Sequence, residues 1–481
     1  MANLKKNLVY NFLLSISQVL IPLVSIPYIA RVLDPEGIGR VSFIDSFTYY
    51  FIAIAEFGIV VYGVRAISRA RSDQQLLHKT VSELLVLHLV TSCCALLLYS
   101  IAVMACWYKI QDMRLLLFSL SFLLVNGFAC EWYFWGQERF RYITIRSLLT
   151  RGLGLLSIFL LVRRPEQYYL YYGIIVCSAI ANLVWNRWTL FREVPIRFRQ
   201  VNWQQHIPHT LVTFLISLFA GIPLLLDNVL LGLVGSTAAV GIYAFSVKIA
   251  RIVSALFTDA FLVLYPRTVA LIEQQDQSGM QAVILKSVQL LTLLAIPAGA
   301  GLYLLADPFV QVFLGSRFGA VAANLRIIAL FPLLKGWGVL LSKQVLVAHD
   351  QEKLFLRSLV AGSILFVGFT LVLSYYFADQ GACIALLLSE GVVLAMNYYY
   401  IRQRIGALRL FDWKTAGNAL IGSLVFVPIV YGVRLQFEAP AMVLMVSVVL
   451  CIPAYFGLQL FVLRNTFVRA VYQGGWAYFK A

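Results

Sequence analysis

Long apolar segments follow one another along the whole chain, separated by short polar connections. A helix needs about 20 apolar residues to cross a ~30 Å hydrocarbon core, and these segments are long enough. They are continuous, without the short alternating pattern of a membrane β-barrel, so they predict helices. We expect fourteen spans, at 8–33, 38–62, 76–104, 113–135, 142–162, 168–190, 209–233, 238–264, 282–305, 321–346, 355–377, 381–401, 414–434 and 440–463.

Composition supports the same class. Of the 481 residues, 61% are hydrophobic and 12% are charged, whereas soluble domains carry roughly 25% charged residues. We therefore predict an all-α polytopic membrane protein. The net charge of +16 is spread over short loops, so we expect no nucleic-acid partner. The cysteines and histidines lack metal-ligand spacing, and no phosphate loop or nucleophile motif occurs, so we expect no metal, cofactor or enzymatic activity.

Lys and Arg residues gather in alternate loops, which the positive-inside rule assigns to the cytoplasm. The Lys- and Arg-rich loops include 65–79, 192–199 and 402–409, and the loops between them are poorer. This distribution predicts that both termini are cytoplasmic.

The most polar connection, 191–208, separates two halves. A weak internal repeat supports the division, because a shift of 202 residues places 38–43 over 240–245. With an even number of spans, the halves share one orientation, as in several transporter folds. We expect an N-terminal six-helix lobe at 1–200, a C-terminal six-helix lobe at 201–405, and two additional helices with a cytoplasmic tail at 406–481.

Four cations lie well inside the predicted spans, away from their ends: Arg151, Lys248, Arg251 and Lys335. A cation in hydrocarbon is costly and normally faces a protein interior or a watery cavity, so it indicates function. We expect these four to bind an anionic substrate. A structural ion pair with a neighbouring carboxylate is the alternative for Lys248 and Arg251. Snorkelling toward the membrane surface would account for Arg146, which lies nearer the end of its span.

The first predicted span carries polar residues at spacings of three and four, which places them on one helical face. Asn11 and Gln18 belong to this face, and we expect them to line the same cavity as the cations. Tight packing of helices through small and polar residues is the alternative interpretation.

Several carboxylates also lie within the predicted spans. Asp45 and Glu56 are eleven residues apart, the same spacing that separates Lys248 from Asp259. A carboxylate in a low-dielectric environment takes up a proton more readily. The candidates for coupling to a proton or sodium ion are Asp227, Asp259, Glu56 and Asp45.

Three stretches resemble the Wzx-type flippases of lipid-linked oligosaccharides, which belong to the MATE-like MOP superfamily. They run from Ile21 to Arg71, from Glu131 to Arg146 (EWYFWGQERFRYITIR) and from Leu226 to Ile252. The resemblance implies two six-helix lobes around a cavity, with two further C-terminal helices. Asp227, Gly241, Tyr243 and Lys248 fall on recurring positions of the family pattern.

The resemblance also implies a function: alternating access that moves an undecaprenyl-pyrophosphate-linked glycan, such as an O-antigen unit, to the periplasmic leaflet. It implies coupling to a proton or sodium gradient, a bacterial inner-membrane location among membrane lipids, and cooperation with polysaccharide polymerase or chain-length machinery.

Two alternatives stay open at this point. A MATE-type multidrug or cation exporter would need a cavity dominated by carboxylates, whereas the intramembrane charge here is rich in cations. A polytopic polysaccharide polymerase or acyltransferase would usually need a sizeable outer loop, and the outer loops here are short.

Overall fold

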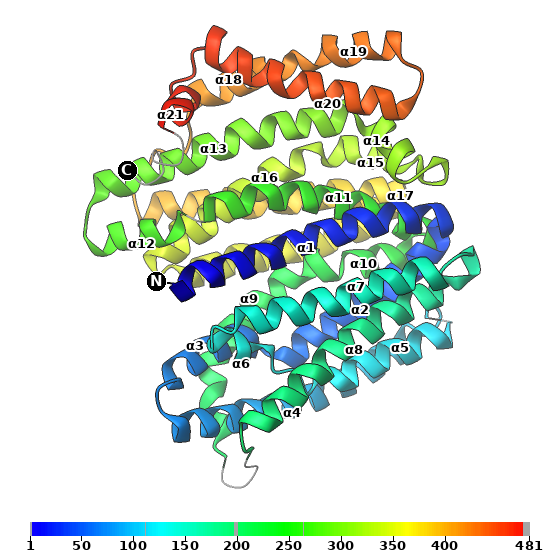
Figure 1. Ribbon diagram of the computed structural model, residues 1–481, viewed down its shortest axis with the longest axis vertical. Helices are drawn as coiled ribbons and strands as arrows, with labels where there is room; N and C mark the ends of the chain where they lie inside the picture. The colour runs from blue at the N-terminus through cyan, green and yellow to red at the C-terminus, as the bar shows by residue number, and fades with distance from the viewer. Residues whose placement is uncertain (1, 111, 197–200, 263, 475–481) are drawn as a thin grey trace. The chain divides into compact units, whose positions relative to one another are not determined.

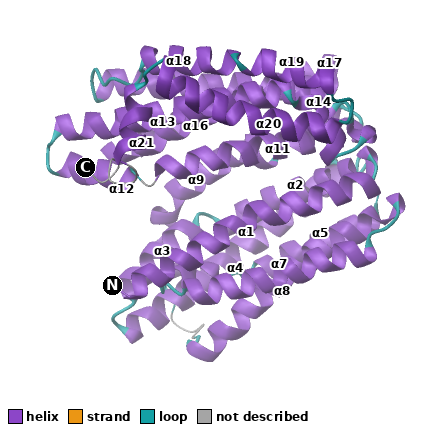
Figure 2. Cartoon of the chain, turned by 45° about the horizontal axis from the view of Figure 1, so that its top comes forward, coloured by secondary structure: helices purple, strands orange, loops and turns teal. Residues whose placement is uncertain are grey.

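The computed structural model describes the chain except for residues 1, 111, 197–200, 263 and 475–481. The described residues form helices and their connections, without a strand (Figure 2), which confirms the all-α class. Twelve helices among them are long and apolar enough to cross a membrane. The expected number of fourteen is not confirmed.

The chain divides into two compact units, Met1–Gly241 and Ile242–Ala481. This boundary differs from the predicted lobes 1–200, 201–405 and 406–481, which remain a prediction. The helices of the first unit are α1 (Ala2–Val32), α2 (Pro35–Glu56), α3 (Ile59–Ala70), α4 (Gln74–Ala105), α5 (Met113–Asn126), α6 (Glu131–Gly136), α7 (Phe140–Leu161), α8 (Tyr168–Glu193), α9 (Ile207–Leu225) and α10 (Asp227–Val234).

Helix α11 (Thr237–Leu262) begins in the first unit and continues into the second. The remaining helices are α12 (Tyr265–Glu273), α13 (Gln277–Leu304), α14 (Ala306–Phe313), α15 (Val321–Ile327), α16 (Phe331–Val339), α17 (Glu352–Arg404), α18 (Trp413–Leu424), α19 (Phe426–Gln436), α20 (Pro440–Gly457) and α21 (Thr466–Gly474).

The chain reverses direction within the segment labelled α17. Ala378 has a non-helical backbone, with φ of 47° and ψ of −127°. A Cβ atom at Gly362 would lie 2.2 Å from the Cγ2 of Val393, although a straight helix would place these residues roughly 46 Å apart. The run is therefore two antiparallel helices, and the kink falls between the predicted spans 355–377 and 381–401.

A second interruption lies in the predicted span 38–62. Helix α2 ends at Glu56, and Phe57 and Gly58 both have positive φ angles, 45° and 73°. A side chain at Gly58 would collide with α9, since a Cβ atom there would lie 2.6 Å from the Thr213 hydroxyl oxygen. The break thus places the Glu56 carboxylate at the end of α2, inside the apolar stretch.

The core of the first unit is built around α6. Trp132, Tyr133 and Phe134 are buried there, and α6 packs against α3. Glycine permits this close contact, because a Cβ atom at Gly63 would lie 3.1 Å from the Trp132 ring. Helix α8 packs against both α5 and α7 in the same unit (Figure 1).

Candidate functional site

A cavity of about 310 Å³ opens among the helices α2, α3, α4, α5, α6, α7 and α8 of the first unit, and we call it the unit 1 cavity. Two of the residues predicted to be functional line it, Arg151 from α7 and Glu56 from the end of α2. The other ionisable and amide residues of its lining are Tyr49, His88, Asn126, Glu131, Arg146, Asn182 and Asn186.

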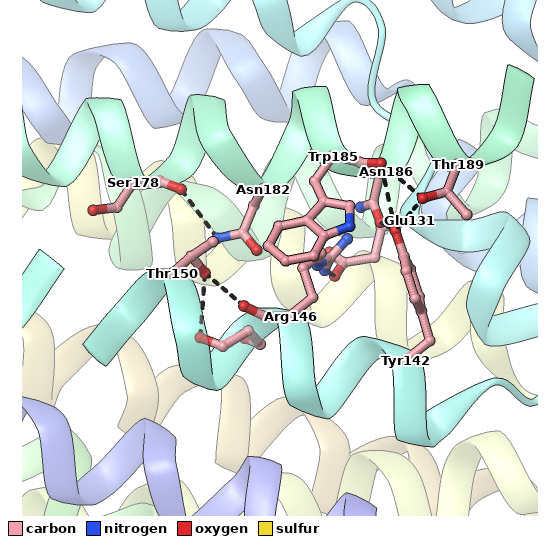
Figure 3. Close-up of polar contacts among 10 residues, drawn as sticks. Glu131, Tyr142, Arg146, Thr150, Ser178, Asn182, Trp185, Asn186 and Thr189 are labelled. Atoms are coloured by element: carbon pink, nitrogen blue, oxygen red, sulfur yellow. Dashed lines mark hydrogen bonds and ion pairs between the residues drawn. The ribbon is translucent and has the colours of Figure 1, made fainter. Parts of the chain in front are cut away.

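The most buried charge of the cavity is Arg146. Its Nη2 donates a hydrogen bond of 2.6 Å to Oε1 of Glu131 (Figure 3), with the Arg side chain 3% exposed and the Glu side chain 48% exposed. Arg146 is therefore buried within the protein and paired, and snorkelling remains a prediction. Its Nε and Nη1 have no hydrogen-bond partner in the described chain. Because an unmade hydrogen bond of a buried charged group is costly, these N–H groups are suited to a bound acceptor.

Arg151 and Glu56 lie half-buried in the same cavity. Among the residues that the structure describes, neither forms a hydrogen bond or an ion pair. Arg151 follows Thr150, whose hydroxyl donates to the carbonyl oxygens of Arg146 and Ser147 and so is bound within α7 (Figure 3). The fold has brought together a guanidinium and a carboxylate that are 95 residues apart in sequence, since 151 − 56 = 95.

Polar atoms of neutral side chains complete the lining. In the described chain, Oδ1 of Asn126, Oδ1 of Asn182 and Nε2 of His88 are buried and lack a hydrogen-bond partner. Asn182 is oriented by its Nδ2, which donates to the carbonyl oxygen of Ser178 at 3.1 Å (Figure 3). Buried polar groups are normally paired, so a cavity with several unpaired ones is suited to a polar ligand.

A tyrosine of α7 contacts both Arg146 and helix α8. The Tyr142 hydroxyl donates to Oγ1 of Thr189 at 2.9 Å, and the guanidinium of Arg146 lies over the Tyr142 ring at 5.7 Å from its centroid (Figure 3). The contact tethers α7 to α8 and restricts the orientation of the Arg146 side chain.

The charges of the unit 1 cavity are balanced. The lining carries two cations, Arg146 and Arg151, and two carboxylates, Glu56 and Glu131. The sequence predicts a surplus of cations, and this cavity does not have one. Sequence reasoning missed Arg146 and Glu131, although both belong to the stretch EWYFWGQERFRYITIR that carries the family resemblance.

Lys335 lies in the second unit and already has a partner. Its Nζ donates to Oε1 of Glu390 at 2.6 Å, with Lys335 42% exposed and Glu390 9% exposed. The helix is interrupted nearby, because α16 ends at Val339 and a π-helical segment, Leu340–Leu346, follows. Substrate binding by Lys335 remains a prediction.

The other predicted residues lie elsewhere. In the second unit Lys248 is exposed and Arg251 is half-buried, both on α11. In the first unit Gln18 is exposed on α1, Asp45 is half-buried on α2, and Asp227 is buried at the start of α10. Two side chains, Asn11 and Asp259, lie outside the described residues. All of these assignments stay predictions.

Asp227 acts locally as a helix-terminal acceptor. Its Oδ1 accepts a hydrogen bond of 2.8 Å from the backbone N–H of Asn228, and the Asn228 side chain donates to the Ser46 hydroxyl of α2 at 2.8 Å.

Within the described residues, no group of three or more His, Cys, Asp and Glu side chains could hold a metal ion.

Comparisons with known proteins agree with this architecture. Residues 4–272 match the family described as "Polysaccharide biosynthesis protein". Over 413 residues the chain is 23% identical to the "Putative O-antigen transporter" of Escherichia coli (strain K12), covering 83% of this chain and 97% of that protein.

Two solved structures share the fold. The lipid II flippase MurJ, in an inward closed conformation, superposes with a TM-score of 0.71 at 12% identity, covering 97% of this chain and all of that one. An inward-facing multidrug resistance MATE family transporter of the MOP superfamily gives a TM-score of 0.62 at 16% identity, covering 81% of this chain and 99% of that one. The family match spans more than half of the 481 residues and confirms the predicted resemblance, so the chain belongs to the polysaccharide biosynthesis protein family and has the fold of MOP-superfamily transporters.

Proposed function

We propose that this protein is a flippase that moves a lipid-linked oligosaccharide across a bacterial inner membrane. Its substrate would be an undecaprenyl-pyrophosphate-linked unit of O-antigen or another surface polysaccharide, transferred from the cytoplasmic to the periplasmic leaflet by alternating access. Family membership, the O-antigen transporter relative and the flippase fold support this proposal. The polymerase or chain-length machinery that consumes the glycan would be its partner.

Arg151 carries the argument for an anionic substrate. It lies half-buried in the unit 1 cavity, within a helix long and apolar enough to span a membrane. Such a cation is costly unless something compensates its charge, and the described residues supply no hydrogen bond or ion pair to it. A pyrophosphate would supply that compensation, since guanidinium groups bind phosphate oxygens bidentately.

Arg146 would add to the same subsite. Its Nε and Nη1 are unpartnered in the described chain and its position is held by Glu131 and Tyr142. A preorganised donor loses less conformational freedom when it binds. Lys248, Arg251 and Lys335 remain candidates for further contacts with the diphosphate, and Asn11 and Gln18 for contacts with sugar hydroxyls.

Glu56 is our first candidate for ion coupling. A phosphate that enters the cavity would repel the Glu56 carboxylate, and uptake of a proton by Glu56 would relieve the repulsion. Substrate binding and proton binding would then favour each other. Asp45, Asp227 and Asp259 remain alternative coupling groups, and sodium remains an alternative to the proton.

Transport by purified protein in vesicles tests the proposal. We expect Arg151→Gln to reduce translocation of undecaprenyl-pyrophosphate-linked glycan by about tenfold or more, as for loss of a hydrogen bond to a charged group. Arg141→Gln is a matched control, because Arg141 is exposed on the same helix and does not line the cavity. Unchanged transport by Arg151→Gln would exclude this residue from the substrate site.

A second candidate function is export of organic cations. Glu56 favours it, because this carboxylate lines the unit 1 cavity and is not engaged in an ion pair within the described chain. Extrusion of ethidium from the same vesicles, without glycan translocation, would support an exporter. A new glycosidic or ester bond on the glycan would instead reveal an enzyme.

A further inference from the structure

A second cavity of the first unit, about 350 Å³ in volume, lies at the end of α3, and we call it the α3 pocket. It is enclosed by α3, the first turns of α4, and the segment that leads into α9. Its lining includes Tyr62, Arg65, Arg69, Leu76, His206 and His209. The site described above involves none of these residues.

The two arginines give the pocket its charge. Arg65 and Arg69 are four residues apart on α3, so they lie on the same helical face, and both are exposed. In the described chain neither forms a hydrogen bond or an ion pair. The neighbouring Arg71 differs, because its Nη1 lies 3.2 Å from Oε2 of Glu138.

The Glu83 carboxylate of α4 is hydrogen-bonded to other groups. It is buried, and it accepts a hydrogen bond of 2.7 Å from Gln205 Nε2 and one of 3.2 Å from the Asn202 backbone N–H. His206 Nε2 also lies 3.0 Å from the carboxylate. Both oxygens of Glu83 are thus engaged, and two guanidinium groups are left to face the pocket.

The same network holds the wall of the pocket in place. The two ring nitrogens of His206 make different contacts: Nε2 is hydrogen-bonded to the Glu83 carboxylate, and Nδ1 to the Tyr62 hydroxyl at 2.8 Å. The Tyr62 ring is stacked against His209, with centroids 5.9 Å apart and an interplanar angle of 2°. Exposed arginines at helix ends are common on protein surfaces. Here they lie beside aromatic side chains that are held in place by their own contacts, so the pocket has a defined shape.

Apolar side chains border this cationic surface. Leu76 lines the pocket and is 48% exposed, and Ala66 of α3 lines it as well. An anion that carries an acyl or prenyl chain would satisfy the arginines and cover these residues at once. A free inorganic phosphate would leave them uncovered.

We infer that the α3 pocket binds the phosphate headgroup of a membrane lipid through Arg65 and Arg69. Two lipids carry this chemistry, a polyprenyl diphosphate carrier and an anionic glycerophospholipid. If the lipid is the polyprenyl diphosphate carrier, the pocket is a docking site that the substrate occupies before the substrate reaches the unit 1 cavity. This case rests on the proposed function. In the second case the pocket is a lipid site that is independent of the substrate.

Native mass spectrometry of the full-length protein in detergent can separate the two sources. The probes are undecaprenyl diphosphate and phosphatidylglycerol, each added alone. We expect the double variant Arg65→Gln/Arg69→Gln to bind at least one of them about tenfold or more weakly, as for loss of hydrogen bonds to charged groups. Lys79→Gln/Arg141→Gln removes the same charge from two exposed residues outside the pocket, and it should bind both lipids as the wild type does.

The pattern of loss decides the source. Weaker binding of undecaprenyl diphosphate alone indicates substrate docking, and weaker binding of phosphatidylglycerol alone indicates a phospholipid site. Unchanged binding of both lipids, or equal weakening by the control, overturns the inference. Arg65→Lys/Arg69→Lys should restore part of the affinity, which guards against misfolding. Loss of transport in Arg151→Gln tests the proposed function separately, because Arg151 lies outside the α3 pocket.

Discussion

Gly39 of α2 and Gly241 of α11 pack directly against each other's helices. A Cβ atom at Gly39 would lie 1.8 Å from the carbonyl oxygen of Thr237, and one at Gly241 would lie 2.0 Å from that of Pro35. The contact is reciprocal under the shift of 202 residues, since 35 + 202 = 237 and 39 + 202 = 241.

We predict that Gly39→Ala and Gly241→Ala each destabilise the protein. The added methyl group meets backbone, which cannot rotate away, and overpacking of this kind costs roughly 1–3 kcal/mol or more. Thermal unfolding in detergent measures the loss. Gly152→Ala is the control, because a Cβ atom there has no neighbour within 4 Å, and alanine is favoured over glycine in a helix. Equal melting temperatures for all three variants would contradict the close approach.

The ion pair between Arg146 and Glu131 gives a second prediction. Glu131→Gln leaves the buried guanidinium of Arg146 without a carboxylate. We expect a loss of roughly 1–3 kcal/mol, as for an unmade hydrogen bond of a buried group. Glu193→Gln is the control variant. Glu193 forms an ion pair with Arg139, and both side chains of that pair are partly exposed. Exposed pairs contribute less than about 1 kcal/mol. Chemical unfolding should rank the two variants in this order, and the reverse order would refute the buried pair.

Lys335 and Glu390 allow structural and substrate roles to be separated. Lys335→Gln leaves the buried carboxylate of Glu390 unpaired, so we expect lower stability and lower transport. In Lys335→Gln/Glu390→Gln no charge is left unpaired, so stability should recover. If Lys335 binds substrate, transport stays low in this double variant. Full recovery of transport would mean that the lysine only neutralises Glu390.

Lys248 and Arg251 are the cations of α11, and their role as substrate ligands is a prediction of its own. We expect Lys248→Gln/Arg251→Gln to abolish export of the glycan and to leave membrane insertion intact. Surface polysaccharide in a strain that lacks its own flippase measures export, and membrane fractionation measures insertion. Export at the wild-type level would remove both residues from the site.

Asp112, in the connection between α4 and α5, should make stability depend on acid pH. Partial burial alone would raise the pKa of this carboxyl, but hydrogen bonds from Arg114 and Tyr168 outweigh burial and hold the pKa below its usual 3.8. The Tyr168 hydroxyl donates to Asp112 at 2.6 Å. Because the folded pKa lies below the unfolded one, the stabilisation is present above 3.8 and is lost as pH falls through the folded value. Asp112→Asn should therefore be less stable than wild type near neutral pH.

The difference between these two proteins should shrink as the pH is lowered below 3.8. Melting temperatures of both proteins across this range provide the measurement. A constant difference at every pH would show that the Asp112 charge does not contribute.

The helix break after Glu56 could not be predicted from the sequence. Hydropathy predicts one span across 38–62, and the structure ends α2 at Glu56 and begins α3 at Ile59. A side chain at position 58 would collide with residues of α9, which are more than 150 positions away in the sequence. The requirement for glycine there is therefore not visible in the local sequence. The reversal of α17 was predictable, because the apolar run there is too long for one span.

The ion-pair partners of the intramembrane cations could not be predicted from the sequence either. Lys335 and Arg151 look alike in the sequence, as single cations within apolar runs. The fold gives Lys335 the carboxylate of Glu390, and it leaves Arg151 in a cavity without an ion-pair partner among the described residues. Arg146 looked like a surface cation, and it is buried against Glu131.

Sequence by itself determined that this is a multi-pass helical protein, where most of its apolar helices run, and which family it resembles, because segment length, apolar continuity and local motifs are read along the chain. Only the tertiary structure decided which charges meet, which are neutralised and which line a cavity. Electrostatic pairing depends on distances between helices, and those distances are set by packing between residues far apart in the sequence.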